Sequence, residues 1–215
     1  MSNSHDITRR GALAGALASA PVLAEAAPAP VVTLLGDSLT AGYGLPSDQT
    51  LPAQLQRELK ALGINATVRN AGVNGDTTAS GMRRVDTSVR ADTDLVVVAL
   101  GGNDLLTLIE PARVRANLDA IVGRLKARRM KVILAGLQAP LELGAYARAY
   151  NAVFPAVARA HQVVLHGSLL AGVALDRRYN QPDLIHPNAA GVRIIARRLA
   201  PVVASALKVK AAAVR

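Results

Sequence analysis

The sequence predicts an α/β fold built on a five-stranded, parallel, doubly wound sheet with helices on both faces. Strand-like and helix-like segments alternate five times along the 215 residues. The strongest strand segments are continuous apolar runs, which are typical of parallel strands buried on both faces. Parallel strands need crossover connections, and helix-like segments lie between the strand segments here. The order therefore indicates a single domain after the N-terminal segment.

Five segments have the composition of strands. Val31–Leu35 is an uninterrupted apolar run, and residues 94–104, "DLVVVALGGND", are β-branched and bounded by glycines. Residues 64–72, "INATVRNAG", mix polar with apolar positions, so we expect a more exposed strand there. The fourth and fifth strands are expected in residues 130–137, "MKVILAGL", and residues 162–166, "QVVLH".

The segments between these strands have the spacing of helices. In the first of them, leucines recur at helical intervals and Gly63 ends the pattern. Pro111 suits the first turn of another. The predicted helices are Leu51–Leu62, Thr77–Arg90, Pro111–Arg129, Ala145–His161 and an amphipathic C-terminal helix within residues 186–207.

The composition excludes several classes of protein. The formal net charge is +10, which favours anionic partners, but aromatic residues make up only 2% of the chain, so base-stacking surfaces are scarce. We therefore expect no nucleic-acid binding. The arginine pairs at 83–84, 128–129 and 197–198 are interpreted as solvated helix faces or helix ends. The absence of cysteine excludes disulfides and thiolate metal sites.

The N-terminus has the layout of an export signal. Arg9 and Arg10 precede the small-residue and leucine-rich segment Gly11–Leu23, and an A-x-A cleavage pattern ends at Ala26. We expect residues 1–26 to be a signal peptide, residues 27–215 to form the mature domain, and the protein to be periplasmic or secreted. The arginine pair is similar to a twin-arginine signal, although Ala12 stands where a phenylalanine is common, so the general secretory route stays open. A cytoplasmic extension is the alternative. The apolar segment is too short for stable membrane insertion.

Polar residues follow the predicted strands, at the edge where open α/β sheets bind their ligands. Ser38 follows the first strand, and Asp183 and His186 precede the last helix. A serine hydroxyl needs an adjacent base to act as a nucleophile, and a histidine supplies one. Asp183 lies three residues before His186, so one turn can direct its carboxylate at the imidazole. This set predicts acyl transfer.

An oxyanion hole is predicted from three further donors. The backbone N–H groups of Ser38 and Gly75 and the side-chain amide of Asn103 all follow predicted strands. Such donors stabilise the tetrahedral intermediate, and the loss of one typically costs about 2.7–4 kcal/mol.

Each of these residues also has a structural explanation. Ser38 can cap a helix, Asn103 can occupy a left-handed turn, and Pro187 after His186 can simply start the last helix. For Asp37 we favour a structural role, in which its carboxylate binds nearby backbone N–H groups. His161 and His166 flank the fifth strand without an acid at matching spacing, so packing or surface roles are expected. No residue cluster has the spacing of a metal site.

Four sequence segments, taken in their order along the chain, resemble the motifs of a known family. They are "LLGDSLTAGYGL", "NAGVNGDTT", "VVVALGGNDLL" and "DLIHPNAAG", and they span most of residues 31–200. The chain resembles the SGNH, or GDSL-type, hydrolases, and within them the secreted thioesterase I, arylesterase and lysophospholipase group. The resemblance implies a three-layer α/β/α fold of flavodoxin-like type. It also implies Ser38 as nucleophile, His186 and Asp183 as base and orienting acid, and an oxyanion hole of Ser38, Gly75 and Asn103.

The resemblance further implies a small-molecule acyl ester or thioester substrate and no cofactor. Two loops, residues 102–110 and 138–146, are expected to set substrate choice. Their apolar residues can line an acyl groove or pack on the core. Leu51 lies where some relatives carry a tryptophan, which affects only the expected pocket shape. The candidate acyl-binding residues are Leu105, Leu106, Leu108, Ile109, Leu141 and Leu143.

Three other functions remain open at this point. A carbohydrate O-deacetylase of the same family would act on acetylated sugars. A non-catalytic lipid- or glycan-binding protein would have no need of the five site residues together. A flavin carrier is disfavoured because the first turn lacks a Ser/Thr-rich phosphate loop and aromatic residues are scarce. The sequence does not indicate an oligomeric state.

Overall fold

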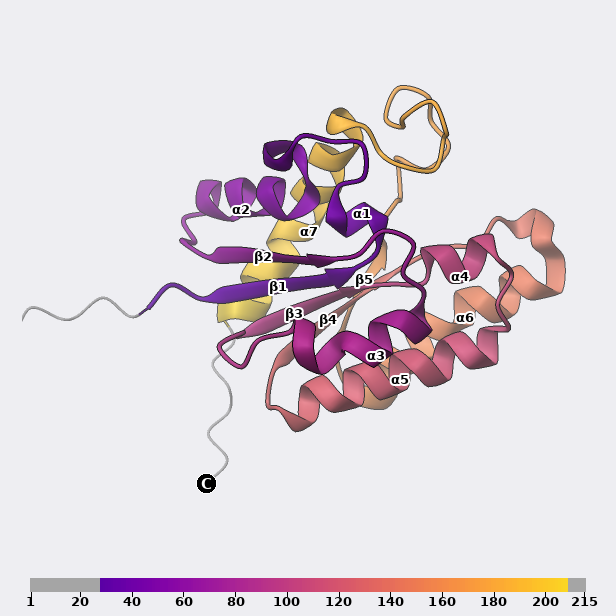
Figure 1. The fold of residues 1–215 in the computed structure, drawn as a ribbon, viewed down its shortest axis with the longest axis horizontal. Coiled ribbons are helices and arrows are strands. Elements are labelled where there is room, and N and C mark those ends of the chain that lie inside the picture. Colours follow the sequence, from indigo (N-terminus) through magenta and orange to yellow (C-terminus); the bar gives the residue numbers. More distant parts are fainter. Residues whose placement is uncertain (1–27, 209–215) are drawn as a thin grey trace, which may run out of the picture.

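A computed structural model gives the structure of residues 28–208. Five parallel strands form one sheet in the order β2-β1-β3-β4-β5 (Figure 1). This order is that of a flavodoxin-like doubly wound sheet, so the predicted fold class is confirmed. The strands are β1 Val31–Gly36, β2 Thr67–Gly72, β3 Leu95–Ala99, β4 Lys131–Gly136 and β5 Val164–Ser168.

Helices cover both faces of the sheet, which gives the three layers. On one face α2 packs against α7, and on the other α3 packs against α5 and α5 against α6 (Figure 1). The helices are α1 Ser38–Ala41, α2 Leu51–Ala61, α3 Thr78–Ser88, α4 Gly102–Leu106, α5 Pro111–Ala127, α6 Gly144–His161 and α7 Ala189–Lys208, with 3-10 turns at Ser47–Gln49 and Leu141–Leu143.

The strand order reverses at β1. The connection from β1 to β2 runs toward one edge of the sheet, whereas β2 is followed by a crossover to β3 on the other side of β1. Right-handed crossovers in opposite directions place their helices on opposite faces. The loops after β1 and β3 therefore diverge and leave a crevice beyond the carboxyl ends of these two strands.

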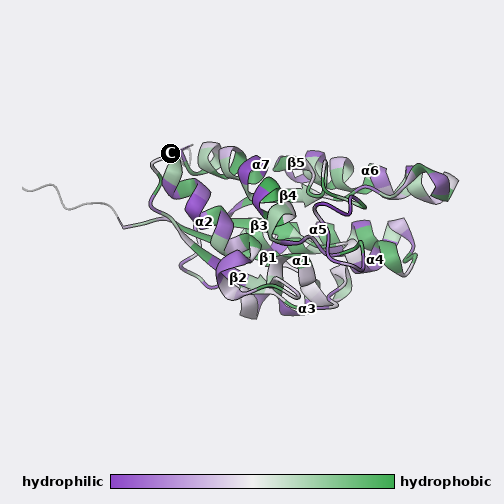
Figure 2. Ribbon diagram, turned by 90° about the horizontal axis from the view of Figure 1, so that it is seen from above, coloured by the Kyte–Doolittle hydropathy of each residue, from purple (hydrophilic) through white to green (hydrophobic). Residues whose placement is uncertain are grey.

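The core lies on both sides of the central strands. All five residues of β3 are buried, as are most residues of β1 and β4. The edge strand β2 is partly exposed along its whole length, as its mixed composition predicts. In Figure 2 the central strands are coloured as hydrophobic, and the most hydrophilic segments lie on the surrounding helices and loops.

Two differences from the predicted elements have local causes. The helices α1 and α4 have four and five residues, too few for a periodic apolar pattern to announce them. The last helix begins at Ala189 rather than near residue 186, because the Asn188 side chain accepts hydrogen bonds from the backbone N–H groups of Ala190 and Gly191. Asparagine is a favoured residue before a helix for this reason.

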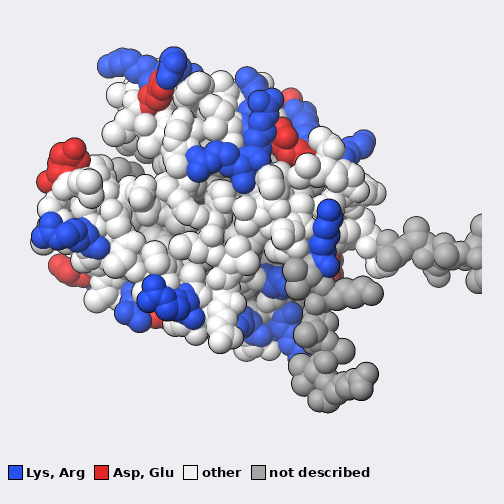
Figure 3. All heavy atoms as spheres, turned by 180° about the vertical axis from the view of Figure 1, so that it is seen from behind, with Lys and Arg blue, Asp and Glu red and all other residues white. Residues whose placement is uncertain are grey.

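Charged side chains are dispersed over the surface. On the face shown in Figure 3, lysine and arginine alternate with uncharged areas, and several of them lie beside acidic residues. Within residues 28–208, no helix combines the length and the apolar character that crossing a bilayer requires. The predicted signal segment, residues 1–26, lies outside the described residues.

Gly72 permits the close approach of the end of β2 to α1, and its replacement gives a test of this packing. A Cβ atom at Gly72 would lie 2.2 Å from the backbone nitrogen of Ala41 and 2.8 Å from the carbonyl oxygen of Asp37. Since both are backbone atoms, no flexible side chain can move aside. We expect Gly72→Ala to lower the free energy of unfolding by about 1–3 kcal/mol, as measured by urea denaturation.

Gly123→Ala is the matched control for this substitution. A Cβ atom there meets only the Cε1 atom of His161 at 3.6 Å, an ordinary van der Waals distance within α5. Replacing a glycine inside a helix should raise the free energy of unfolding by about 0.5–1 kcal/mol. Equal destabilisation by the two substitutions would show that the close approach at Gly72 is not the cause.

Candidate active site

A cavity of about 590 Å³ lies beyond the carboxyl ends of the strands. Its walls come from the loops after β1, β3, β4 and β5 and from residues 184–186. Ser38, Asn103 and His186 line the same cavity although they are far apart in the sequence. The polar residues predicted at two strand ends and before the last helix therefore meet at one place.

Ser38 is held at the entrance to α1, directly after the buried strand β1. Asp37 precedes this short helix, and its Oδ1 atom accepts a hydrogen bond from the Leu39 N–H at 3.0 Å. Ser38 is itself buried, and its Oγ atom lies 2.9 Å from Nε2 of His186. The structure thus assigns the capping role to Asp37, in agreement with its predicted structural role, and leaves the Ser38 hydroxyl facing the imidazole.

The imidazole of His186 is oriented from its other side by Asp183. The Nδ1 atom of His186 lies 2.7 Å from Oδ2 of Asp183, and Oδ1 accepts the backbone N–H groups of Ile185 and His186. These hydrogen bonds, first of all the one from the imidazole, lower the pKa of Asp183 to about 2. An ionised Asp183 holds the proton on Nδ1 and leaves the Nε2 lone pair for the Ser38 hydroxyl.

The loop that carries this pair is irregular but well connected. The backbone N–H of Gln181 donates to the carbonyl oxygen of His186 at 2.8 Å, and a single antiparallel bridge joins Asn180 to Pro187. The Gln181 side chain also donates to the carbonyl oxygen of Tyr43, whose ring centroid lies 4.5 Å from that of His186. The base is therefore tied to the segment that follows the nucleophile.

The two other proposed oxyanion donors are placed by neighbouring turns. Asn103 lies inside α4, and its Nδ2 atom donates to the carbonyl oxygen of Asp76 at 2.8 Å. The left-handed position before α4 is taken by Gly101, with a φ of 121°, so the alternative of a left-handed Asn103 is wrong. Gly75 has a φ of 79°, which favours glycine, and it lies next to Asp76. It does not line the cavity in the structure.

A second set of hydrogen bonds joins the segments next to these donors. The buried Asp104 accepts from the backbone N–H of Thr78 at 2.8 Å and from its hydroxyl at 2.6 Å. The amide of Asn117 in α5 donates to the same hydroxyl. Since Asp104 is adjacent to Asn103, the start of α3 and the start of α4 are held together.

The apolar residues predicted for an acyl groove divide into two groups. Leu105, Leu106, Leu108 and Leu143 line the cavity. Ile109 and Leu141 are not among the lining residues, because Ile109 packs against the core and Leu141 points into solvent with 77% of its surface exposed.

The remaining apolar wall was missed by the sequence reasoning. It is formed partly by residues after β5 and beside the base, and the apolar run "LLAGVAL" at 169–175 was the available signal. A loop of that composition directly after a strand has few reasons to be apolar other than burial or ligand contact. The additional apolar residues that line the cavity include Leu137, Leu170, Leu175, Leu184 and Ile185.

The two other histidines near β5 lie outside the cavity. His161 contacts Asp119 with a distance of 3.2 Å between Nε2 and Oδ1, an acid that sequence spacing did not indicate. His166 is buried in β5, and this burial lowers its pKa. Among residues 28–208, no group of three or more His, Asp or Glu side chains is arranged to hold a metal ion.

A model of the GDSL-like lipase/acylhydrolase family matches residues 34–194, a range that contains the whole cluster around Ser38. The chain belongs to this family. This membership and the names of its relatives show that the protein is a carboxylic ester hydrolase.

Two curated relatives have informative names. Esterase TesA of Pseudomonas aeruginosa is 36% identical over 180 residues, which cover 83% of this chain and 89% of the relative. Thioesterase 1/protease 1/lysophospholipase L1 of Escherichia coli K12 is 32% identical over 166 residues, with 76% and 78% covered.

Solved structures agree with this placement in the GDSL-like family. A crystal structure of TesA matches with a TM-score of 0.77 at 33% identity, over 82% of this chain and 99% of that one. AlinE4, an SGNH-hydrolase family esterase, matches with a TM-score of 0.70 at 40% identity, over 84% and 97%.

The buried carboxyl of Asp37 predicts a pH dependence of stability. Burial raises its pKa from 3.8 to about 6. Between these values the folded protein keeps a proton that the unfolded chain releases, so this group's contribution to stability falls as the pH rises through that window. Asp37→Asn keeps an acceptor for the Leu39 N–H and removes the titration. The free energy of unfolding of Asp37→Asn, relative to that of the wild type, should therefore increase by about 3 kcal/mol between about pH 4 and about pH 6.

Urea denaturation at several pH values measures this difference directly. A constant offset between Asp37→Asn and the wild type reflects the new amide and does not bear on the prediction, because only the change with pH reports the titration. A difference that stays the same from about pH 4 to about pH 7 would contradict it.

Proposed function

We propose that the protein is a serine esterase and thioesterase that forms an acyl-enzyme on Ser38. The chain of hydrogen bonds from Asp183 through His186 to Ser38, at 2.7 and 2.9 Å, carries this proposal. Such a chain activates a hydroxyl that is a weak nucleophile by itself. Membership of the GDSL-like lipase/acylhydrolase family supports the same reaction class.

The reaction proceeds in two half-reactions. The Ser38 Oγ atom attacks the substrate carbonyl carbon while its proton moves to Nε2 of His186. The resulting oxyanion accepts from the backbone N–H groups of Ser38 and Gly75 and from Asn103. One of the two Nδ2 protons of Asn103 is bound to Asp76, so the other is the one available to the oxyanion.

The intermediate then collapses and the acyl group stays on Ser38. His186 returns its proton to the leaving alcohol or thiol, and a water molecule repeats the sequence on the acyl-enzyme, which releases the carboxylic acid. This mechanism uses no metal and no cofactor.

The shape and the composition of the cavity favour medium-length acyl chains. Its wall is predominantly apolar, and Leu106, Leu108, Leu175 and Ile185 are strongly exposed around it. Burial of each additional methylene contributes about 0.8 kcal/mol, or about fourfold in kcat/KM, until the wall is filled. A sugar would find few polar partners on such a wall, which disfavours the carbohydrate deacetylase.

The names of the relatives support this substrate class. One relative is named as an esterase, one as an arylesterase and one as a thioesterase and lysophospholipase. For this chain we propose small-molecule acyl and aryl esters, with acyl thioesters and lysophospholipids as further substrates, and no nucleic-acid partner.

Hydrolysis of p-nitrophenyl esters from acetyl to palmitoyl, with an acyl-CoA and an acetylated sugar alongside, tests the proposal. We expect Ser38→Ala to lower kcat by about 10⁴-fold or more, because the acyl-enzyme can no longer form. Ser47→Ala is the matched control, since Ser47 is exposed and lies outside the cavity. Turnover by Ser38→Ala equal to that of the control would remove Ser38 as nucleophile. If the wild type and the Ser47→Ala control also fail to hydrolyse every substrate, the result would favour a binding protein.

We also propose that residues 1–26 direct export and that residues 27–215 form one mature domain in the periplasm or outside the cell. The A-x-A pattern before Ala27 supports cleavage there. N-terminal sequencing of protein from a periplasmic fraction should begin near Ala27. Replacing Arg9 and Arg10 by lysine should block export only on the twin-arginine route. Retention of Met1 would contradict the export proposal.

A further inference from the structure

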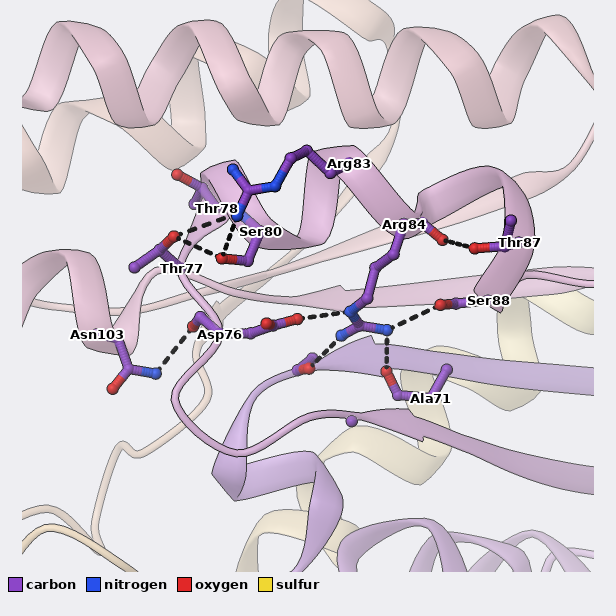
Figure 4. A network of polar contacts seen from close by, with 12 residues as sticks. Ala71, Asp76, Thr77, Thr78, Ser80, Arg83, Arg84, Thr87, Ser88 and Asn103 are labelled. Atoms are coloured by element: carbon purple, nitrogen blue, oxygen red, sulfur yellow. Dashed lines mark hydrogen bonds and ion pairs between the residues drawn. The ribbon is translucent and has the colours of Figure 1, made fainter.

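The side chain of Arg84 in α3 forms an ion pair with Asp76. This contact was not identified from the sequence, because Arg84 does not follow a strand. Only 19% of its side chain is exposed, so its interpretation as part of a solvated helix face is wrong. Its guanidinium donates to the Asp76 carboxylate at 2.5 Å and to the carbonyl oxygens of Ala71 and Gly36, each at 2.8 Å. It also donates to the Ser88 hydroxyl at 3.1 Å (Figure 4).

Apart from Ser88, which lies in α3 itself, these acceptors belong to the strand ends and turns that lead into the active site. Gly36 ends β1 two residues before Ser38, and Ala71 lies near the end of β2. Asp76 directly follows Gly75, and its carbonyl oxygen is the acceptor for Asn103 (Figure 4). One guanidinium therefore contacts the segments that carry Ser38 and Gly75, and it is linked to Asn103 through Asp76.

We propose that Arg84 is the positioning residue of the oxyanion hole, holding the Gly75–Asp76 turn against the end of β1 so that Asn103 and Gly75 face Ser38. This inference rests on the proposed function and assigns no contact between Arg84 and the substrate. Its effect passes through Asp76, which holds Asn103, and through Gly36, which precedes the nucleophile.

The chemistry of arginine suits this position. A guanidinium is planar and carries five donors in a rigid fork, so it can serve several acceptors at fixed angles, whereas a lysine ammonium is a compact charge on a flexible stem. Removing water from an ion pair costs free energy, and an apolar pair of similar volume is often equally stable. Stability alone is thus a weak reason to bury Arg84 and Asp76, while fixed geometry is a strong one.

The neighbouring Arg83 provides a matched control. It is exposed, and its Nη2 atom donates to the Ser80 hydroxyl at 3.0 Å, away from the strand ends (Figure 4). The substitutions Arg83→Lys and Arg84→Lys make the same chemical change at adjacent positions of α3. Only the second removes hydrogen bonds to the turns that carry the oxyanion donors.

The first experiment separates kcat from KM on a p-nitrophenyl ester that the wild type hydrolyses. We expect Arg84→Lys to lower kcat by about 10- to 100-fold, because a displacement of about 1 Å at the reacting groups has effects of this size. KM should stay close to that of Arg83→Lys, since the apolar wall is unchanged. The rate of inactivation by a p-nitrophenyl alkylphosphonate, whose adduct is tetrahedral, should fall by a similar factor. A kcat equal to that of Arg83→Lys would overturn the proposal.

A double-mutant cycle tests the route through Asn103. Asn103→Ala alone should lower kcat by about 10²–10³-fold. If Arg84 acts by placing Asn103, Arg84→Lys should have a smaller effect in the Asn103→Ala background than in the wild type. Full additivity would mean that Arg84 acts elsewhere, and it would also overturn the proposal.

Two other results, a variant that does not fold and a failure of the proposed function, can be distinguished from a failure of the Arg84 proposal. If Arg84→Lys does not fold, as judged by its thermal melt, Asp76→Asn carries the test, because it weakens the ion pair and leaves the Asp76 carbonyl in place. We expect a lower kcat at unchanged KM, and an unchanged kcat would count against Arg84. Loss of the proposed function would instead appear as wild-type activity that survives Ser38→Ala.

Discussion

The register of three neighbouring strands is the constraint on which the site depends. The last residue of β1, Gly36, is paired with Gly72 at the end of β2 and with Ala99 at the end of β3. Because the three strands end at the same level, the loops after them start from one line across the sheet. Ser38 follows two residues after this line, and the turns that carry Gly75 and Asn103 leave from it as well. Backbone hydrogen bonds thus determine the position of the polar groups before any side chain contributes.

Two carboxyl groups at this edge differ in pKa because of their surroundings. Burial raises the pKa of Asp37 to about 6, whereas hydrogen bonds from His186 and from the backbone lower that of Asp183 to about 2. The first group holds the turn under the nucleophile, and the second keeps the charge that orients the imidazole. Residue type alone does not distinguish these functions, but desolvation and hydrogen bonding do.

The sequence predicted the sheet, its helices and the polar residues that meet at the cavity, because strand periodicity and strand-end position are local properties. Ser38 could be found for this reason and His186 from its spacing to Asp183 before the last helix, and the family resemblance reached the same residues. Arg84 could not, since its partners in the strand ends and turns lie 8 to 48 residues away and its helical spacing is that of an ordinary surface arginine. The same holds for Leu175, which lines the cavity from an irregular loop. Contacts made across the fold by long side chains leave no periodic pattern in the chain.

The nucleophile and the base are attached to parts of the molecule with different kinds of backbone structure. Ser38 follows a buried central strand, whereas His186 sits in the irregular segment between β5 and α7, whose antiparallel bridge and most of whose backbone hydrogen bonds lie within the segment itself. Segments of this kind open locally at a lower free energy than the core does. On heating, we therefore expect detachment of this segment to limit the catalytic lifetime of the enzyme. Engineering for heat tolerance should begin between β5 and α7, because a tighter sheet would preserve the fold without prolonging the activity.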